Sequence, residues 1–313
     1  MRVASRRGES VLDTCVIANA GSGKRRGAAL VAELEGLFAR YPGRFALRVV
    51  RRGAEIGGEA ERAVREGFRT VAAAGGDGTI NAVAGSLVGT DRRLGVLPLG
   101  TFNYVARGLG LPEALADAVH VLAEGRERLL DMGEVNGRTF LNNASLGAYA
   151  AILHDREWVY RRWGRSRVAA DLSVLLTLAG FQSPLSLELS ADGQTRRHRT
   201  PLVFVANNAY QLDQFGLAGG ECIASRRLAI YIAPDRGRLG LMRLAVGLAL
   251  RRLRPERDFE LLCGAEVLVE AGRRRRRVAR DGERERLAGP FRFRLRRDAL
   301  RVLVPADPTA DST

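Results

Sequence analysis

Apolar and polar positions follow two different rhythms along this chain of 313 residues. In its first third, short apolar runs rich in β-formers alternate with stretches that carry apolar residues at helical spacing. The predicted strands are 12–18, 45–50, 70–74 and 94–97, and the predicted helices are 28–38, 59–66 and 81–87. Strands that alternate with helices predict a parallel, doubly wound α/β sheet, which binds ligands at the carboxyl ends of its strands.

After Asp131 the pattern changes to short apolar runs separated by turn signals such as Asp192-Gly193 and Asp281-Gly282. The runs are 139–145, 185–190, 202–206, 228–233, 265–271 and 275–279. They predict an antiparallel β domain, interrupted by helices at about 165–178 and 239–253. Two further runs, 291–295 and 300–304, predict a final hairpin that the pattern assigns to neither domain.

Glycine-bearing loops follow three of the predicted strands, at Asn19 to Lys24, Gly75 to Thr79 and Pro98 to Asn103. Glycine lets backbone N–H groups approach phosphate oxygens, and a helix that begins there adds the positive end of its dipole. The first loop is too short for a P-loop, and alone it could be a plain strand-to-helix turn. Asp77, set between glycines, needs a partner such as a ribose hydroxyl or a magnesium-bound phosphate. Together the three loops predict a nucleotide site.

The composition is that of a globular protein, with 46% hydrophobic and 27% charged residues. The three cysteines are far apart and form no CxxC pair, so the sequence predicts neither a disulfide framework nor a zinc site, which fits a reducing cytosol. No signal peptide is recognised, and no apolar run approaches the ~18 residues of a membrane-spanning helix. We expect a cytoplasmic protein that is soluble or bound to a membrane surface.

The formal net charge of +15 would attract phosphate-rich partners, either nucleic acid or an anionic membrane. However, Lys24 is the only lysine, so the arginine content can equally reflect a compositional bias. The same observation draws attention to Lys24, because its compact point charge lies where it could meet a phosphate.

Six segments carry a resemblance to a known family: ANAGSGK (18–24), VAAAGGDGTINAVAGSL (71–87), PLGTFNYVARGLGLP (98–112), LDMGEVNGRTFLNNASLGAYA (130–150), ARDGERERL (279–287) and GPFRFRLRRDALRVLVP (289–305). They resemble the bacterial diacylglycerol kinase catalytic-domain family, which includes lipid kinases and sphingoid-base kinase relatives. The resemblance implies a Rossmann-like α/β domain (NAD kinase/diacylglycerol kinase-like) at 11–132 with 289–305, a β-sandwich lipid-substrate domain at 133–288, and an ATP site between them.

The resemblance and the loops together imply a set of nucleotide-binding residues. These are Asn19, Ala20, Gly21, Ser22, Gly23, Lys24, Gly75, Gly76, Asp77, Gly78, Thr79, Ile80, Asn81, Ala82, Gly100, Thr101 and Asn103. For catalysis, it implies that Glu283 is the general base that takes the proton from the lipid hydroxyl, with Asp281 in support. Which of these two carboxylates is the base stays open, and a bare Asp-Gly-Glu could also be only a turn. Asp131 matches another acidic position of the family.

The chain also departs from the family pattern. The segment that usually binds a structural Mg²⁺ reads IASRRLAIY (223–231) and has no carboxylate, so we expect this metal site to be lost, with Arg226 or Arg227 occupying its charge niche. A usual threonine is absent from 50–53, a usual glutamate is replaced by Ala82, and Tyr104 replaces a common Asp or His. The Mg²⁺ expected here is therefore the ion that accompanies ATP.

Two features favour transient docking onto an anionic membrane: the interleaved aromatic and basic residues of 158–165, and the arginine run 273–277. Either can also be an ordinary solvated face. We expect a lipid substrate and no specific nucleic acid, and we leave a homodimer open.

One rival is an NAD kinase, since that superfamily shares the GGDGT loop and an asparagine motif like 140–143. Another is a nucleotide-sensing or nucleic-acid-binding protein that has kept the fold without turnover.

Overall fold

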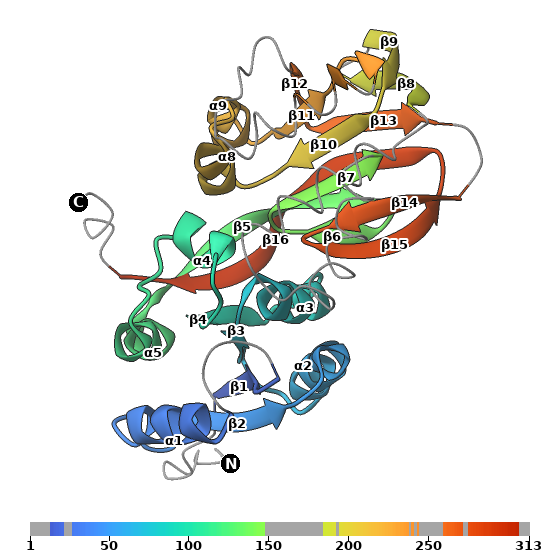
Figure 1. Ribbon diagram of the computed structural model, residues 1–313. Helices are drawn as coiled ribbons and strands as arrows, with labels where there is room; N and C mark the ends of the chain where they lie inside the picture. Colours follow the sequence, from blue (N-terminus) through green and yellow to red (C-terminus); the bar gives the residue numbers. More distant parts are fainter. Residues whose placement is uncertain are drawn as a thin grey trace, which may run out of the picture. The chain divides into compact units, whose positions relative to one another are not determined.

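The computed structural model describes residues 13–21, 27–147, 184–191, 194–237, 239–240, 243, 259–271 and 275–306. The chain divides into two compact units, Met1–Leu130 with Asp298–Thr313, and Asp131–Arg297 (Figure 1). The predicted helix 165–178, the basic and aromatic segment 158–165, and most of the predicted helix 239–253 lie outside the described residues.

The first unit is built on a parallel sheet. Its strands, in spatial order, are β2 (Phe45–Val50), β1 (Thr14–Asn19), β3 (Thr70–Gly75) and β4 (Arg93–Pro98), followed by the last part of β16 (Phe291–Val304). All neighbouring pairs are parallel, and every residue of β1 and β3 is buried. A strand covered on both faces needs apolar residues at every position, which is why these strands appear as continuous apolar runs.

Helices cover both faces of this sheet. They are η1 (Gly53–Glu55), α1 (Gly27–Phe38), α2 (Ile56–Arg65), α3 (Asp77–Leu87), α4 (Tyr104–Gly108) and α5 (Leu115–Glu124). Leu34 of α1 and Val119 of α5 share a core with Val16 and Ala72 of the sheet, while α2 and α3 lie together on the other face (Figure 1). The predicted doubly wound α/β architecture is confirmed.

The second unit is built on antiparallel sheets. One has the order β12 (Glu260–Gly264), β11 (Leu228–Ile232), β10 (Leu202–Ala206), β7 (Asn143–Gly147), β14 (Arg275–Arg280) and β15 (Glu283–Ala288). The other contains β9 (Gln194–Thr200), β8 (Leu185–Ala191), β13 (Glu266–Glu270) and the first part of β16, with β5 (Arg126–Val135) and β6 (Arg138–Phe140) beside it. Both sheets contribute to one apolar core, which contains Leu146, Val205 and Phe293. The predicted β-sandwich is thereby confirmed.

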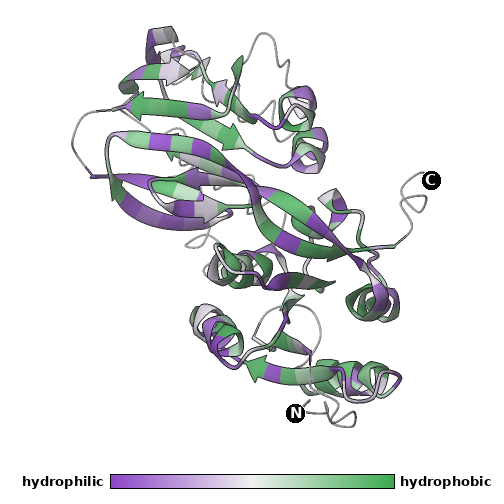
Figure 2. Ribbon diagram, turned by 180° about the vertical axis from the view of Figure 1, so that it is seen from behind, coloured by the Kyte–Doolittle hydropathy of each residue, from purple (hydrophilic) through white to green (hydrophobic). Residues whose placement is uncertain are grey.

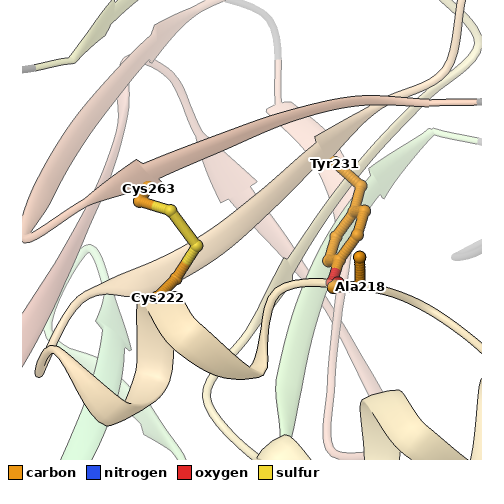
Figure 3. Close-up of a disulfide and its surroundings, with 4 residues drawn as sticks. All are labelled: Ala218, Cys222, Tyr231 and Cys263. Carbon is orange, nitrogen blue, oxygen red and sulfur yellow. A yellow bond between two sulfur atoms is a disulfide. The ribbon is translucent and has the colours of Figure 1, made fainter. Parts of the chain in front are cut away.

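Two short helices, α8 (Ala209–Phe215) and α9 (Gly220–Ala224), pack on the other face of the six-stranded sheet. Gly219, just before α9, has a φ of 118°, and a Cβ there would lie 2.5 Å from the hydroxyl of Tyr231. That hydroxyl donates to the carbonyl oxygen of Ala218 (Figure 3). Burial raises the pKa of Tyr231, so the hydroxyl stays protonated and keeps this bond.

The predicted final hairpin is wrong, because residues 291–304 form the single strand β16. The sequence Arg297-Asp298 looks like a turn, and Asp298 does have a left-handed φ of 51°, but the strand continues through it. Before this residue β16 pairs with β13, and after it β16 pairs with β4. The left-handed residue therefore marks a change of partner, not a reversal of direction.

The prediction of no disulfide is also wrong, because Cys222 of α9 and Cys263 of β12 are bonded (Figure 3). The two cysteines are 41 positions apart, and only the packing of α9 against the sheet brings them together. Cys15 is the remaining thiol, and burial in β1 raises its pKa to about 11.

The central strands are largely hydrophobic, whereas the helices carry both hydrophobic and hydrophilic residues (Figure 2). No helix formed by the described residues is long and apolar enough to cross a lipid bilayer.

Candidate functional site

Three loops leave the carboxyl ends of β1, β3 and β4, which are neighbours in the parallel sheet. The first begins at Asn19, the second is centred on Gly76, and the third runs from Leu99 to Asn103. Because the strands are parallel and adjacent, all three loops lie at the same edge. The sequence prediction that this edge gathers the glycine-bearing loops is confirmed, although Ser22, Gly23 and Lys24 lie outside the described residues.

The second and third loops pack backbone against backbone. A Cβ on Gly100 would lie 2.6 Å from the Cα of Gly76, and a Cβ on Gly76 would lie 3.2 Å from the Cα of Gly100. In addition, the N–H of Leu99 donates to the carbonyl oxygen of Gly75 at 2.9 Å. A surface without Cβ atoms at the start of α3 is suited to close approach by phosphate oxygens, so the residues present fit a nucleotide.

Asn19 ties the first loop to the first turn of α3. Its Nδ2 donates to Oγ1 of Thr79 at 3.2 Å, and its Oδ1 accepts the N–H of Gly21 at 3.1 Å. A Cβ on Gly21 would lie 2.1 Å from the carbonyl oxygen of Arg51, so only glycine fits there. The side chains of Asn19 and Thr79 therefore hold the loops in place.

Asp77, the first residue of α3, has a partner within the protein. Its Oδ1 accepts the N–H of Val105 at 3.0 Å, and this N–H belongs to the first turn of α4, where it has no partner within the helix. The carboxylate also lies at the positive end of the α3 dipole. Asp77 thus joins the second loop to the helix that follows the third loop.

Asn103 closes the third loop on itself. Its Oδ1 accepts the N–H of Gly100 at 2.9 Å, its Nδ2 donates to the carbonyl oxygen of Gly100 at 3.2 Å, and its φ is 49°. Thr101 and Phe102 at the tip are exposed, and the ring of Phe102 stacks on Tyr104 with centroids 5.4 Å apart. The tip therefore presents a hydroxyl and an aromatic ring, while Asn103 supports it.

The predicted nucleotide-binding residues consequently fall into two groups. Asp77, Gly78 and Thr101 are at least partly exposed, whereas Asn19, Thr79, Ile80, Asn81 and Asn103 are buried. Oδ1 of Asn81 is buried and accepts no hydrogen bond from the described residues. The buried members shape the loops, and the exposed members are the ones that a ligand can reach.

In the second unit, Asp281 and Gly282 form the two-residue turn between β14 and β15. Their φ values of 44° and 86° are those of a type I′ turn, as the Asp-Gly pair predicts. Glu283 follows as the exposed first residue of β15, opposite Arg280. The turn that the resemblance assigns to catalysis is therefore the tip of a hairpin.

The carboxylate of Asp281 is fully engaged by backbone. Its Oδ2 accepts the N–H of Leu141 at 2.7 Å, and its Oδ1 accepts the N–H groups of Asn142 and Asn143 at 2.8 and 3.0 Å. Burial raises the pKa of Asp281 to about 6, against the opposing effect of these three N–H donors and of Arg280. Asp281 holds the β6–β7 connection to the hairpin tip, which leaves Glu283 as the exposed carboxylate of the pair.

The β6–β7 connection is held from a second side by Asn207 and Asn208. Nδ2 of Asn207 donates to the carbonyl oxygens of Leu141 and Asp131, at 3.2 and 3.1 Å, and Nδ2 of Asn208 donates to Oδ1 of Asn142 at 2.7 Å. Sequence reasoning missed this network. The repeated Asn-Asn pairs at 142–143 and 207–208 were the signal that could have revealed it.

Asp131 forms a bidentate ion pair with Arg226. Nε donates to Oδ2 at 2.8 Å and Nη2 donates to Oδ1 at 2.5 Å. Arg226 has a left-handed φ of 54° in the connection from α9 to β11. A guanidinium in contact with both carboxylate oxygens does not fit a divalent cation at the same place, and no cluster of three or more His, Cys, Asp or Glu suited to a metal occurs among the described residues.

Comparison with known proteins agrees with this architecture. The family model of the diacylglycerol kinase catalytic domain matches residues 13–135. Diacylglycerol kinases of Staphylococcus aureus strains JH9 and Newman are each 38% identical over 99 residues, which is 31% of this chain and 31% of each relative. The match thus spans less than a third of the length of these relatives.

Solved structures match over nearly the whole chain. A candidate diacylglycerol kinase from Bacillus anthracis str. Sterne superposes with a TM-score of 0.72 at 18% identity, covering 96% of this chain and 98% of the other. A diacylglycerol kinase structure from the same organism gives a TM-score of 0.67 at 16% identity, with the same coverage.

The chain therefore has the NAD kinase/diacylglycerol kinase-like fold, in which an α/β unit is combined with antiparallel sheets. More particularly, residues 13–135, which contain the GGDGT and PLGTFN segments, are similar to the diacylglycerol kinase catalytic domain.

Proposed function

We propose that this protein is a kinase that transfers a phosphoryl group from ATP to the hydroxyl group of a lipid, diacylglycerol or a related molecule. The observation that carries the proposal is the backbone contact of Gly76 with Gly100, inside the segment that matches the diacylglycerol kinase catalytic domain. Transfer of a phosphoryl group depends mainly on positioning and charge neutralisation, and a glycine-lined edge can supply the positioning.

We assign nucleotide binding to the three loops of the first unit. Because Gly76 and Gly100 have no Cβ, phosphate oxygens can approach the backbone there, and Asp77 and Thr101 supply polar groups that a nucleotide can reach. Gly21 and Asn19 shape the first loop, which continues into Ser22, Gly23 and Lys24. Mg²⁺ bound to ATP would neutralise phosphate charge, and this chain needs only to accept the complex.

We assign proton removal from the lipid hydroxyl to Glu283. It is exposed, whereas the neighbouring Asp281 accepts three backbone N–H bonds that hold it against residues 141–143. In this assignment Asp281 is a positioning residue that fixes the hairpin tip. A carboxylate base at this point would contribute about 10²- to 10⁴-fold to the rate.

The reaction places the protein at the inner face of the membrane, at least transiently, because its acceptor is a lipid. The formal net charge of +15 favours a bilayer that contains anionic phospholipid. Between encounters with the membrane, the protein would lie in the cytoplasm.

The test is a thin-layer assay with labelled ATP and four acceptors: diacylglycerol, phosphatidylglycerol, sphingosine and NAD. We expect one of the lipids to be labelled, and Asp77→Ala and Glu283→Ala to lower the rate by about 10²-fold or more. Glu35→Ala, which removes an exposed carboxylate of α1, is the matched control and should keep full activity. Labelling of NAD alone, or full activity of both site variants, would refute the proposal.

An NAD kinase is less well supported. The asparagine motif that suggested it is engaged within the protein, since Oδ1 of Asn142 accepts from Asn208 and Nδ2 of Asn143 donates to Gln211. All of these bonds serve the β6–β7 connection. The NAD arm of the assay decides the matter.

A further inference from the structure

The β14–β15 hairpin has one face on which every charged residue is arginine. Directly opposed residues of an antiparallel pair share a face, and the register pairs Arg275 with Ala288, Arg277 with Arg286, and Ala279 with Arg284. We call the four arginines 275, 277, 284 and 286 the arginine face. Both strands of the hairpin are largely hydrophilic (Figure 2).

The opposite face of the same hairpin is different. There Val278 is buried in the sandwich core, and Arg280 forms an ion pair with Glu285 at 2.6 Å. Both glutamates of β15, Glu283 and Glu285, belong to this face. The acidic residues of the two strands are therefore all on one face, and the arginine face has none.

Three members of the arginine face, Arg275, Arg277 and Arg286, are exposed. Nη2 of Arg275 donates to the backbone carbonyl oxygen of Arg286, and none of the three forms an ion pair with a carboxylate of the described residues. Like charges directly opposite one another, such as Arg277 and Arg286, destabilise a sheet unless an anion lies between or above them.

The arginines of β9 provide an internal comparison. Arg196, Arg197 and Arg199 each contact a carboxylate, of Glu260, Glu188 and Asp235 respectively. The arginine-rich composition of the chain thus does not by itself leave arginines without acidic neighbours. Protection of an edge strand explains charge on β15, but it does not explain why the charges are sorted by sign between two faces.

We propose that the arginine face docks this protein onto a bilayer that contains anionic phospholipid, a proposal that rests on the lipid kinase function above. Guanidinium groups match phosphate oxygens in a bidentate geometry, and the three exposed arginines, Arg275, Arg277 and Arg286, present a multiply charged surface. Glu283 lies at the tip of the same hairpin, on its opposite face, three positions before Arg286, or about 10 Å along the strand. Docking of this hairpin therefore fixes the height of Glu283 relative to the lipid surface.

The test compares two variants with the same loss of charge. Arg277→Gln/Arg286→Gln removes the centre of the arginine face, and Arg196→Gln/Arg197→Gln removes two exposed arginines of β9. Sedimentation with vesicles of phosphatidylcholine containing 30% phosphatidylglycerol measures binding, and pure phosphatidylcholine vesicles give the baseline. At about 5-fold for each arginine, the first variant should bind about 25-fold more weakly than the wild type, and the second should change little.

Two further measurements keep the result interpretable. Arg277→Lys/Arg286→Lys, which keeps the charge, should retain binding, and thermal unfolding should show that all variants are folded. Phosphorylation of detergent-dispersed diacylglycerol should be the same in wild type and Arg277→Gln/Arg286→Gln, because that substrate needs no bilayer. If the wild type does not phosphorylate detergent-dispersed diacylglycerol, the kinase function is refuted. If both arginine-to-glutamine variants bind anionic vesicles equally weakly, only the docking role of the arginine face is refuted.

Discussion

Arg226 binds both carboxylate oxygens of Asp131 through two different nitrogens, at 2.8 and 2.5 Å. This pair joins the connection before β11 to β5, and the backbone of Asp131 is held as well by Asn207. The guanidinium of Arg226 thus supplies the positive charge beside the Asp131 carboxylate, at the place where a bound cation would otherwise lie.

The first prediction concerns this pair. Arg226→Met should lower the free energy of unfolding by about 1 kcal/mol, because a bidentate, partly exposed ion pair is lost. Arg226→Lys should recover only part of it, since an ammonium cannot reproduce the two parallel bonds. Urea unfolding of both variants measures the difference, and equal stability of all three proteins would contradict the prediction.

The same pair predicts how the protein responds to magnesium. Without nucleotide, the Tm of the wild type should be the same in EDTA and in millimolar Mg²⁺, because Arg226 already occupies the Asp131 carboxylate. A rise in Tm with Mg²⁺ alone would show a resident metal and would overturn this expectation.

A third prediction separates two roles of Asp77. Asp77→Asn keeps an acceptor for the N–H of Val105, whereas Asp77→Ala leaves that N–H without its partner. We expect the alanine variant to lose about 1–2 kcal/mol of stability and the asparagine variant to lose less than about 0.5 kcal/mol. If both variants lose activity while only one loses stability, the charge itself serves the reaction; full activity of Asp77→Asn would show that Asp77 acts only by positioning.

The close approach of two loops gives a fourth prediction. Gly100→Ala places a Cβ 2.6 Å from the Cα of Gly76, so the loops must separate, at a cost of about 1–3 kcal/mol and with loss of nucleotide binding. Gly85→Ala is the matched control, since Gly85 is exposed on α3, lies outside the predicted site, and a Cβ there has no neighbour within 4 Å. Calorimetric titration with MgATP compares the two, and normal binding by Gly100→Ala would contradict the assignment of this edge to the nucleotide.

A fifth prediction follows from Asp281, whose pKa is raised to about 6 by burial. A group whose pKa is higher in the folded than in the unfolded state binds a proton on folding, so its contribution to stability falls as pH rises from about 4 to 6. Relative to Asp281→Asn, which does not titrate, the wild type should lose up to about 3 kcal/mol across this interval, at 1.4 kcal/mol for each unit of pKa. Urea unfolding at pH 4.5 and 7 measures this loss, and a gain of stability with pH would mean that the three N–H donors outweigh burial.

Much of the first unit could be predicted from sequence, because buried parallel strands appear as apolar runs. The prediction of 45–50 matches β2, and that of 70–74 falls one residue short of β3. The missed strands are edge or boundary strands. QTRRHRT (194–200) and ERERLA (283–288) each lie at the edge of a sheet and carry mainly polar side chains, so hydrophobicity gives no signal for them.

The candidate site was predictable in its location more than in its contacts. Glycines at strand ends identified the loops, but the sequence could not show that Asp77 binds Val105, or that Asp281 binds residues 141–143. Both partners are backbone N–H groups, which every residue except proline possesses, so their positions depend on tertiary packing. The Cys222–Cys263 bond was missed for the same reason.

The strand β16 has a consequence for synthesis of the protein. Its last residues complete the parallel sheet beside β4, and the whole of the second unit is translated between β4 and these residues. During synthesis the edge of β4 therefore stays unpaired until the final strand has been translated, and an unpaired strand edge can pair wrongly with another segment or chain. A fragment that ends at residue 135 would contain every glycine-bearing loop and would still lack the strand that closes its sheet.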